Sequence, residues 1–153
     1  MAFSISSSAF KAGGSIPRDF TADGRDVSPA MSWENPPPGT HAFALVCDDP
    51  DAPMGTWVHW VIWNLPASAR GLPEAVESKK TLADGSAQGK NDFGRIGYGG
   101  PSPPAGNPHR YRFRLYALRE KLSLAAGASR RELDKAMAGT ILAAAELIGM
   151  YRR

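Results

Sequence analysis

The sequence predicts a mainly β protein in which short strands are joined by turns. It contains 13 prolines and 16 glycines, and these are spread through the 153 residues. Proline and glycine interrupt long helices and mark turns, so this distribution favours short strands. Residues 110–118 give the clearest strand signal, because apolar side chains alternate there with arginines and a tyrosine, as in a sheet with one solvated face. The length predicts one domain, residues 1–153.

Composition narrows the class of protein. The single cysteine, Cys47, excludes an intramolecular disulfide and follows an apolar run, which favours a buried, unreactive thiol. The net charge of +3 comes from 18 basic and 15 acidic residues mixed along the chain, unlike the clustered basic face of a nucleic-acid-binding protein. No apolar run approaches the ~20 residues of a membrane span. The first residues lack a positive segment before an apolar core, so we expect a cytoplasmic protein.

The first half of the chain predicts two short strands and one buried strand. Residues 3–6 are a short strand, and residues 11–40 are mostly loop with one extended piece, in which Trp33 is expected to be a core residue. Residues 41–47 form a nearly continuous apolar run between turn signals. This pattern is typical of a strand that is buried on both faces.

The next strand is predicted over residues 57–64. If its side chains alternate strictly, one face carries Trp57, His59, Val61 and Trp63. Residues 67–77 have room for one turn of helix, and residues 78–108 have no periodicity. A loop of that length inside a compact domain is often functional.

A C-terminal helix is predicted over residues 130–151. Ser129 and Glu132 have the spacing of a capping box. Apolar residues then recur at three- and four-residue steps as far as Tyr151, which is the pattern of an apolar helical stripe. We expect this stripe to dock on the core, and a contact between two copies in a homodimer is the alternative.

Titratable side chains gather in two segments that are rich in turn residues. Asp49, Asp51 and His59 lie within a dozen residues, and a second Pro/Gly segment, 97–111, ends in a second histidine, His109. If the strands that follow these turns are neighbours, both imidazoles converge on a small anion pocket. Asp49 and Asp51 flank a proline, so only one is expected to face the pocket, and Asp49 is the better candidate. Asp51 is expected to fix the turn, as aspartate commonly does.

Other readings of these residues stay open. Two histidines and an aspartate also suit iron or zinc, although no local spacing typical of a metal site is present. Residues 97–100 could offer free N–H groups to an anion. The prolines that follow exclude a dinucleotide-binding helix, and no phosphate-binding loop or nucleophilic serine motif occurs. The arginines of residues 110–114 are interpreted as a solvated face, and the peptide bonds before Pro50 and Pro53 are candidates for the cis form.

Four segments together resemble one known family. They are residues 49–53 (Asp-Pro-Asp-Ala-Pro), 57–60 (Trp-Val-His-Trp), 97–101 (Gly-Tyr-Gly-Gly-Pro) and 109–111 (His-Arg-Tyr). In this order and spacing they are similar to the phosphatidylethanolamine-binding proteins, in particular to the bacterial, Raf-kinase-inhibitor-like branch. The resemblance covers nearly the whole chain.

The resemblance implies both a fold and a site. The implied fold has a large central antiparallel sheet, a smaller second sheet and a few peripheral helices. The implied site is a small pocket for phosphate, phosphorylated head groups or carboxylates, without a cofactor. Carried over by position, its residues are Asp49, His59, His109 and Tyr111, with Gly100 and Pro53 at the rim and Trp57 beside His59.

Two functions from different classes follow. The first is a non-catalytic binding protein, with a regulatory role and a kinase or protease partner as further expectations. In it, protonated imidazoles attract the anion, so sulfate binding should tighten from about pH 8 to about pH 6, through the usual histidine pKa. The alternative is a hydrolase or phosphoesterase that uses His59 or His109 as general base, although the sequence shows no nucleophile for it.

Overall fold

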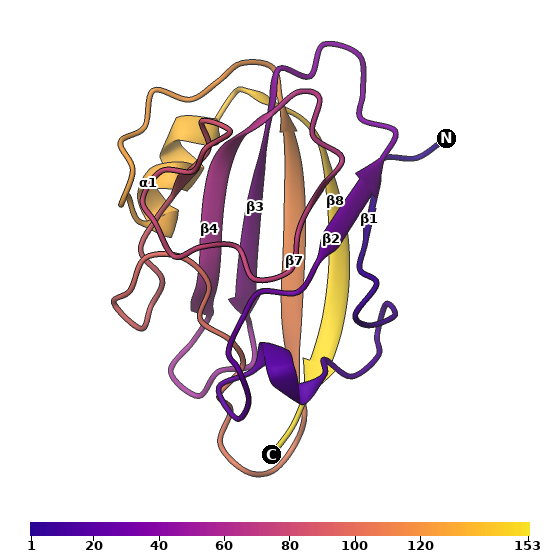
Figure 1. Cartoon of the computed structure of the whole chain (residues 1–153), viewed down its shortest axis with the longest axis vertical. Helices are drawn as coiled ribbons and strands as arrows, with labels where there is room; N and C mark the ends of the chain where they lie inside the picture. Colours follow the sequence, from indigo (N-terminus) through magenta and orange to yellow (C-terminus); the bar gives the residue numbers. More distant parts are fainter.

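Two antiparallel sheets and one helix make up the fold of residues 1–153 in the computed structural model (Figure 1). The larger sheet has the strand order β6-β4-β3-β7-β8, and the smaller sheet has the order β1-β2-β5. The mainly β class and its two sheets are thereby confirmed. The strands are β1 (Ser4–Ser6), β2 (Met31–Glu34), β3 (Ala42–Asp49), β4 (Trp57–Pro66), β5 (Gly71–Leu72), β6 (Ala87–Gln88), β7 (His109–Leu118) and β8 (Ile141–Tyr151), and the helices are the 3-10 turn η1 (Arg18–Phe20) and α1 (Arg130–Met137).

Each face of the large sheet buries its own apolar cluster. The inner cluster lies between the two sheets and includes Trp33, Phe43 and Phe113. The outer cluster lies under α1 and includes Trp63 and Leu133. In Figure 1, α1 lies beside β4, and the small sheet lies on the β8 side of the large sheet. Strand β3 has both clusters at its faces, and all of its residues are buried, which confirms the prediction for residues 41–47.

The predicted C-terminal helix is correct only in its first half. Helix α1 begins with the capping box, in which Ser129 Oγ accepts from the Glu132 N–H and the Glu132 carboxylate accepts from the Ser129 N–H. It ends at Met137, and Gly139 adopts a φ of +82° in the turn that follows. Residues 141–151 form β8, which pairs along the whole of β7. The helix predicted for these residues was wrong, and the proposed dimer stripe does not exist.

Strand β4 departs from strict alternation. Cys47 pairs with Trp60, but the next residue of β3, Asp48, pairs with Val58. His59 is therefore the extra residue of a β-bulge, a feature that redirects side chains. Val61 and Trp63 belong to the outer cluster, whereas His59 stacks edge-on against the inner residue Tyr111. The predicted common face of these residues was wrong for this reason.

The connecting segments hold little regular structure. The helical turn suggested for residues 67–77 is absent, and β5 pairs with β2 there. The long segment 78–108 contains only β6, and every peptide bond in the chain is trans. None of the helices has the length and hydropathy needed to cross a membrane.

Candidate functional site

A cavity of about 210 Å³ opens where β3, β4 and β7 meet the loops at one end of the large sheet. These strands are neighbours, so Asp49 at the end of β3, Trp57 at the start of β4 and His109 at the start of β7 come together. The lining consists of Asp49, Ala52, Pro53, Trp57, His59, Phe93, Ser102, Pro103, Pro104, His109 and Tyr111. Of the residues predicted for the site, only Gly100 does not line the cavity.

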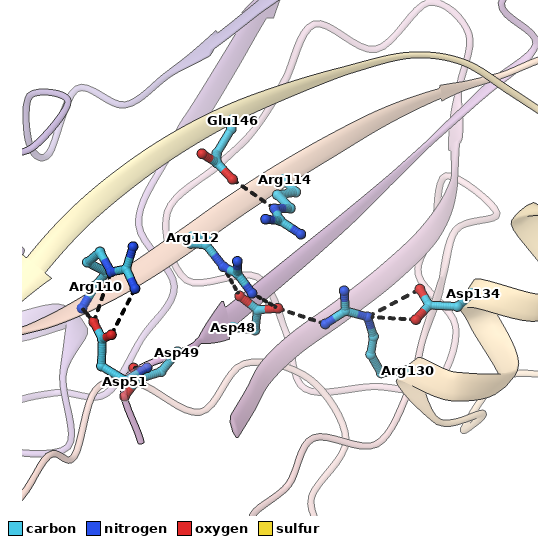
Figure 2. A network of polar contacts seen from close by, with 9 residues as sticks. All are labelled: Asp48, Asp49, Asp51, Arg110, Arg112, Arg114, Arg130, Asp134 and Glu146. Carbon is cyan, nitrogen blue, oxygen red and sulfur yellow. Dashed lines mark hydrogen bonds and ion pairs between the residues drawn. The ribbon is translucent and has the colours of Figure 1, made fainter. Parts of the chain in front are cut away.

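Asp49 holds one imidazole in place. Its Oδ2 accepts a 2.7 Å hydrogen bond from His109 Nδ1, and its Oδ1 accepts from the Asp51 N–H at 2.8 Å. Asp51 in turn accepts from the backbone N–H of Arg110 and from its guanidinium, and this contact lowers the pKa of Asp51 to about 2. Asp49 therefore holds His109, whereas Asp51 ties the turn to Arg110 of β7 (Figure 2).

His59 is held by a backbone carbonyl. Its Nδ1 lies 2.6 Å from the carbonyl oxygen of Gly99, and the residue is 2% exposed. Burial lowers its pKa, and the Gly99 carbonyl and the Asp49 charge offset only part of that effect. For His59 this argues against the expectation of a readily protonated imidazole.

The glycines of residues 97–100 do not form the predicted anion nest. The N–H groups of Gly97, Gly99 and Gly100 donate to the Gly89 carbonyl, the His59 carbonyl and the Asp26 carboxylate. At Gly100 a Cβ atom would lie 2.4 Å from the Phe20 carbonyl oxygen, so only glycine allows this loop to seat on η1. Gly100 therefore contributes by placing its neighbour, the Gly99 carbonyl, against His59.

Two donors at the cavity have no partner in the protein. Trp57 Nε1 and Tyr111 Oη are the only buried side-chain nitrogen or oxygen atoms of the chain that lack a hydrogen bond. Both residues line the cavity. Burial and the charge of the nearby Asp49 carboxylate, which the hydroxyl approaches without reaching hydrogen-bond geometry, raise the pKa of Tyr111 and keep its hydroxyl protonated. A buried polar group without a partner costs about 1–3 kcal/mol, so both atoms are suited to receive an acceptor from a ligand.

The fixed positive charges of this region lie outside the cavity. No lysine or arginine lines it. Arg110, Arg112 and Arg114 pair with Asp51, Asp48 and Glu146, respectively (Figure 2). Arg110 and Arg114 are partly solvated, as predicted, whereas the Arg112 side chain is only 20% exposed and its partner Asp48 is buried. No group of three or more histidine, cysteine or carboxylate residues is placed to hold a metal ion.

Sequence reasoning missed several lining residues. Phe93 stacks edge-on against both Trp57 and His59. The proline segment after Gly100 is held by Arg153, which donates to the Pro103 carbonyl and to Ser102 Oγ. The unusual length of the loop was the only signal for these residues, and nothing in the sequence near Arg153 pointed to the cavity.

Comparisons with known proteins agree with this fold. The sequence model of the phosphatidylethanolamine-binding protein family matches residues 6–152. A UPF0098 protein of Methanothermobacter thermautotrophicus is 51% identical over 95% of both chains, and one of Aquifex aeolicus is 49% identical over 97% of this chain and 88% of its own. The solved structure of Escherichia coli YbcL, described as a member of the mammalian family, has a TM-score of 0.91 at 31% identity and covers 100% of this chain and 99% of its own. A homologue from Chlamydia trachomatis has a TM-score of 0.90 at 36% identity, covering 99% and 98%.

Proposed function

The chain belongs to the phosphatidylethanolamine-binding protein family, and on that premise we propose that it binds a small oxyanion in the cavity between Asp49, His59 and Tyr111. Phosphate, a phosphorylated head group or a carboxylate would each offer oxygen acceptors of suitable size. The cavity volume is about 210 Å³. That is below the range of sites for drug-sized ligands, so only the anionic end of a larger ligand would enter.

The observation that carries this proposal is the pair of unpartnered donors. Trp57 Nε1 and Tyr111 Oη come from different strands, yet both border one cavity. Buried polar groups in native proteins are nearly always hydrogen-bonded, and exceptions ask for an explanation. An oxyanion that accepts from both donors supplies one.

The hydrolase alternative has less support. The Asp49–His109 pair has the geometry of an oriented base. A serine nucleophile would need to donate a hydrogen bond to such a base. Ser102 Oγ accepts from Arg153 and makes no hydrogen bond with His109. A kinase or protease partner and a cytoplasmic location stay predictions, as does a homodimer.

Calorimetric titration with inorganic phosphate tests the proposal. Tyr111→Phe and Trp57→Phe should each weaken binding about five- to tenfold, the equivalent of one hydrogen bond. Because each change removes an unpartnered polar atom, neither should lower the free energy of unfolding by more than about 1 kcal/mol, apart from packing effects. The control is Tyr116→Phe, which removes a hydroxyl outside the cavity lining. Unchanged affinity in both cavity variants would place the anion elsewhere.

A further inference from the structure

The cavity offers an acceptor as well as donors. The carbonyl oxygen of Gly99 can only accept, so the 2.6 Å contact fixes a proton on His59 Nδ1. The other ring nitrogen, Nε2, then carries a lone pair in the neutral imidazole. It has no hydrogen-bond partner in the protein, and His59 lines the cavity. The lowered pKa of His59 is consistent with the neutral form.

The charges around His59 disfavour a second negative charge on a bound anion. From β3, Asp49 and Asp48 direct negative potential at the ring. From β7, Tyr111 packs edge-on against it, and His109 is engaged with Asp49. The loops contribute Phe93 and the backbone carbonyls of Gly99 and Gly100. With no lysine or arginine in the lining, a dianion would sit in this partly apolar cavity without a fixed cation, at a high desolvation cost.

We propose that the cavity selects monoanionic oxyanions that carry their own proton, such as dihydrogen phosphate or the monoanion of a phosphomonoester. The P–OH group donates to His59 Nε2, while the unprotonated oxygens accept from Trp57 Nε1 and Tyr111 Oη. This inference rests on the proposed function. It separates phosphomonoesters from sulfate and sulfate esters, and also from phosphodiesters such as an intact phospholipid, because none of these bears an O–H at neutral pH.

Three small anions separate the effect of an O–H group on the ligand from the effect of the ligand's net charge. Methyl phosphate is largely a protonated monoanion near pH 5.5, since the second pKa of a phosphomonoester is about 6. Methyl sulfate is also a monoanion but has no O–H group. Dimethyl phosphate is a monoanionic diester and represents the phosphodiester group of an intact phospholipid. Titration calorimetry of the full chain at about pH 5.5 should give methyl phosphate an affinity at least tenfold above the other two.

The pH dependence provides a second measurement that needs no variant. Between about pH 5.5 and about pH 7.5 the protonated fraction of a phosphomonoester falls roughly twentyfold. Methyl phosphate binding should weaken by about that factor, and methyl sulfate binding should stay nearly constant. If methyl sulfate binding instead tightened in parallel as the pH fell, a titrating histidine would be responsible and the inference would be overturned.

A substitution at His59 tests the acceptor itself. In His59→Asn the side-chain amide can still donate to Gly99, but the Nε2 acceptor is lost, so the preference for methyl phosphate should fall to within about threefold. The matched control is His41→Asn, because His41 Nδ1 makes the same kind of 2.6 Å contact with the Arg119 carbonyl outside the cavity. Should His59→Asn fail to fold, the probe series with the unmodified chain still decides.

The outcomes separate the inference from the proposed function. Equal affinity for the three probes would overturn the selection of protonated anions and leave oxyanion binding intact. A preference for dimethyl phosphate would also overturn it, in favour of the diester. If inorganic phosphate and all three probes fail to bind, the proposed function itself is wrong.

Discussion

Asp48 and Asp49 are neighbours in β3, but their carboxylates serve opposite faces of the sheet. Asp49 turns inward to His109, whereas Asp48 turns outward and accepts from both Arg112 and Arg130 (Figure 2). The Asp48 side chain is 1% exposed. Burial alone would raise its pKa, but the two guanidinium groups outweigh burial and hold the pKa below its usual value. The ionised carboxylate therefore ties α1 to β7 beside the candidate site.

Replacing Asp48 by asparagine should be strongly destabilising. The change leaves two arginines without their buried partner, and breaking such a pair typically costs about 3–5 kcal/mol. Asp134→Asn is the matched control, because Asp134 contacts the same Arg130 but its side chain is 51% exposed, so its loss should cost less than about 1 kcal/mol. Urea denaturation of both variants measures the difference, and equal losses would contradict this account.

Asp48 also contributes to acid sensitivity. A carboxyl group whose pKa is lower in the folded chain stabilises it above the unfolded pKa of about 3.9, and that stabilisation is lost as the pH falls through the folded value. The free energy of unfolding should therefore decline below about pH 4 in the unmodified chain. In Asp48→Asn this decline should be shallower. Parallel curves for the two proteins in urea titrations at several pH values would argue against it.

At the scale of single residues, six of the seven residues predicted for the site line one cavity. The four short segments that carried the resemblance also supplied these residues. What could not be foreseen was which nitrogen of His59 is engaged, because that depends on Gly99, a residue 40 positions away in the chain. The same holds for Trp57 Nε1, whose lack of a partner becomes visible only after all neighbours are placed.

Among the elements, β8 shows how an apolar pattern can mislead. Residues 141–151 are rich in alanine and leucine, which favour helices in isolation. Their apolar residues also fit a period of two, with Ala145 and Leu147 buried on the inner face. Pairing along β7 satisfies the backbone over the whole strand, and this tertiary gain outweighs helix propensity. The bulge at His59 escaped prediction for a similar reason, since it depends on the register between β3 and β4.

A pair of alanine-to-valine changes distinguishes the strand from the helix. Ala144 is exposed and lies opposite Tyr116, so Ala144→Val should raise the free energy of unfolding by up to about 0.5 kcal/mol through strand propensity and the cross-strand pair. Ala136→Val in α1 should lower it by about 0.5 kcal/mol. Chemical denaturation provides both values. A loss of stability at both positions would favour the helix for residues 141–151.

At the scale of the whole molecule, β3 is the strand that contacts both apolar clusters and the cavity. Both apolar clusters pack on it, β4 and β7 pair with it, and its last residue, Asp49, lines the cavity. Opening the sheet at β3 would expose both clusters together, so we expect one cooperative unfolding transition. The composition predicted the mainly β class. It could not predict that the ends of β3, β4 and β7 lie side by side, because that depends on the order of strands in the sheet.

Cys47 in β3 provides a probe of this cooperativity. Its thiol is buried, and burial, followed by the charges of Asp48 and Asp49, raises its pKa well above the usual value. In native buffer it should react with a disulfide reagent only as fast as the whole chain unfolds. Met54→Cys is the positive control, because Met54 is 96% exposed and should label within the mixing time. Rapid labelling of Cys47 without denaturant would reveal local opening of β3.

The unpartnered indole N–H of Trp57 also provides a spectroscopic signal for ligand binding in the cavity. The other three indoles donate to Ala69, Gln88 and Leu124 within the protein. In a nitrogen–proton correlation spectrum, added phosphate should therefore change the chemical shift of one indole signal and leave the other three indole signals unchanged. That single resonance would report occupancy of the cavity without a label, and its shift could be followed in mixtures where the natural ligand is still unidentified.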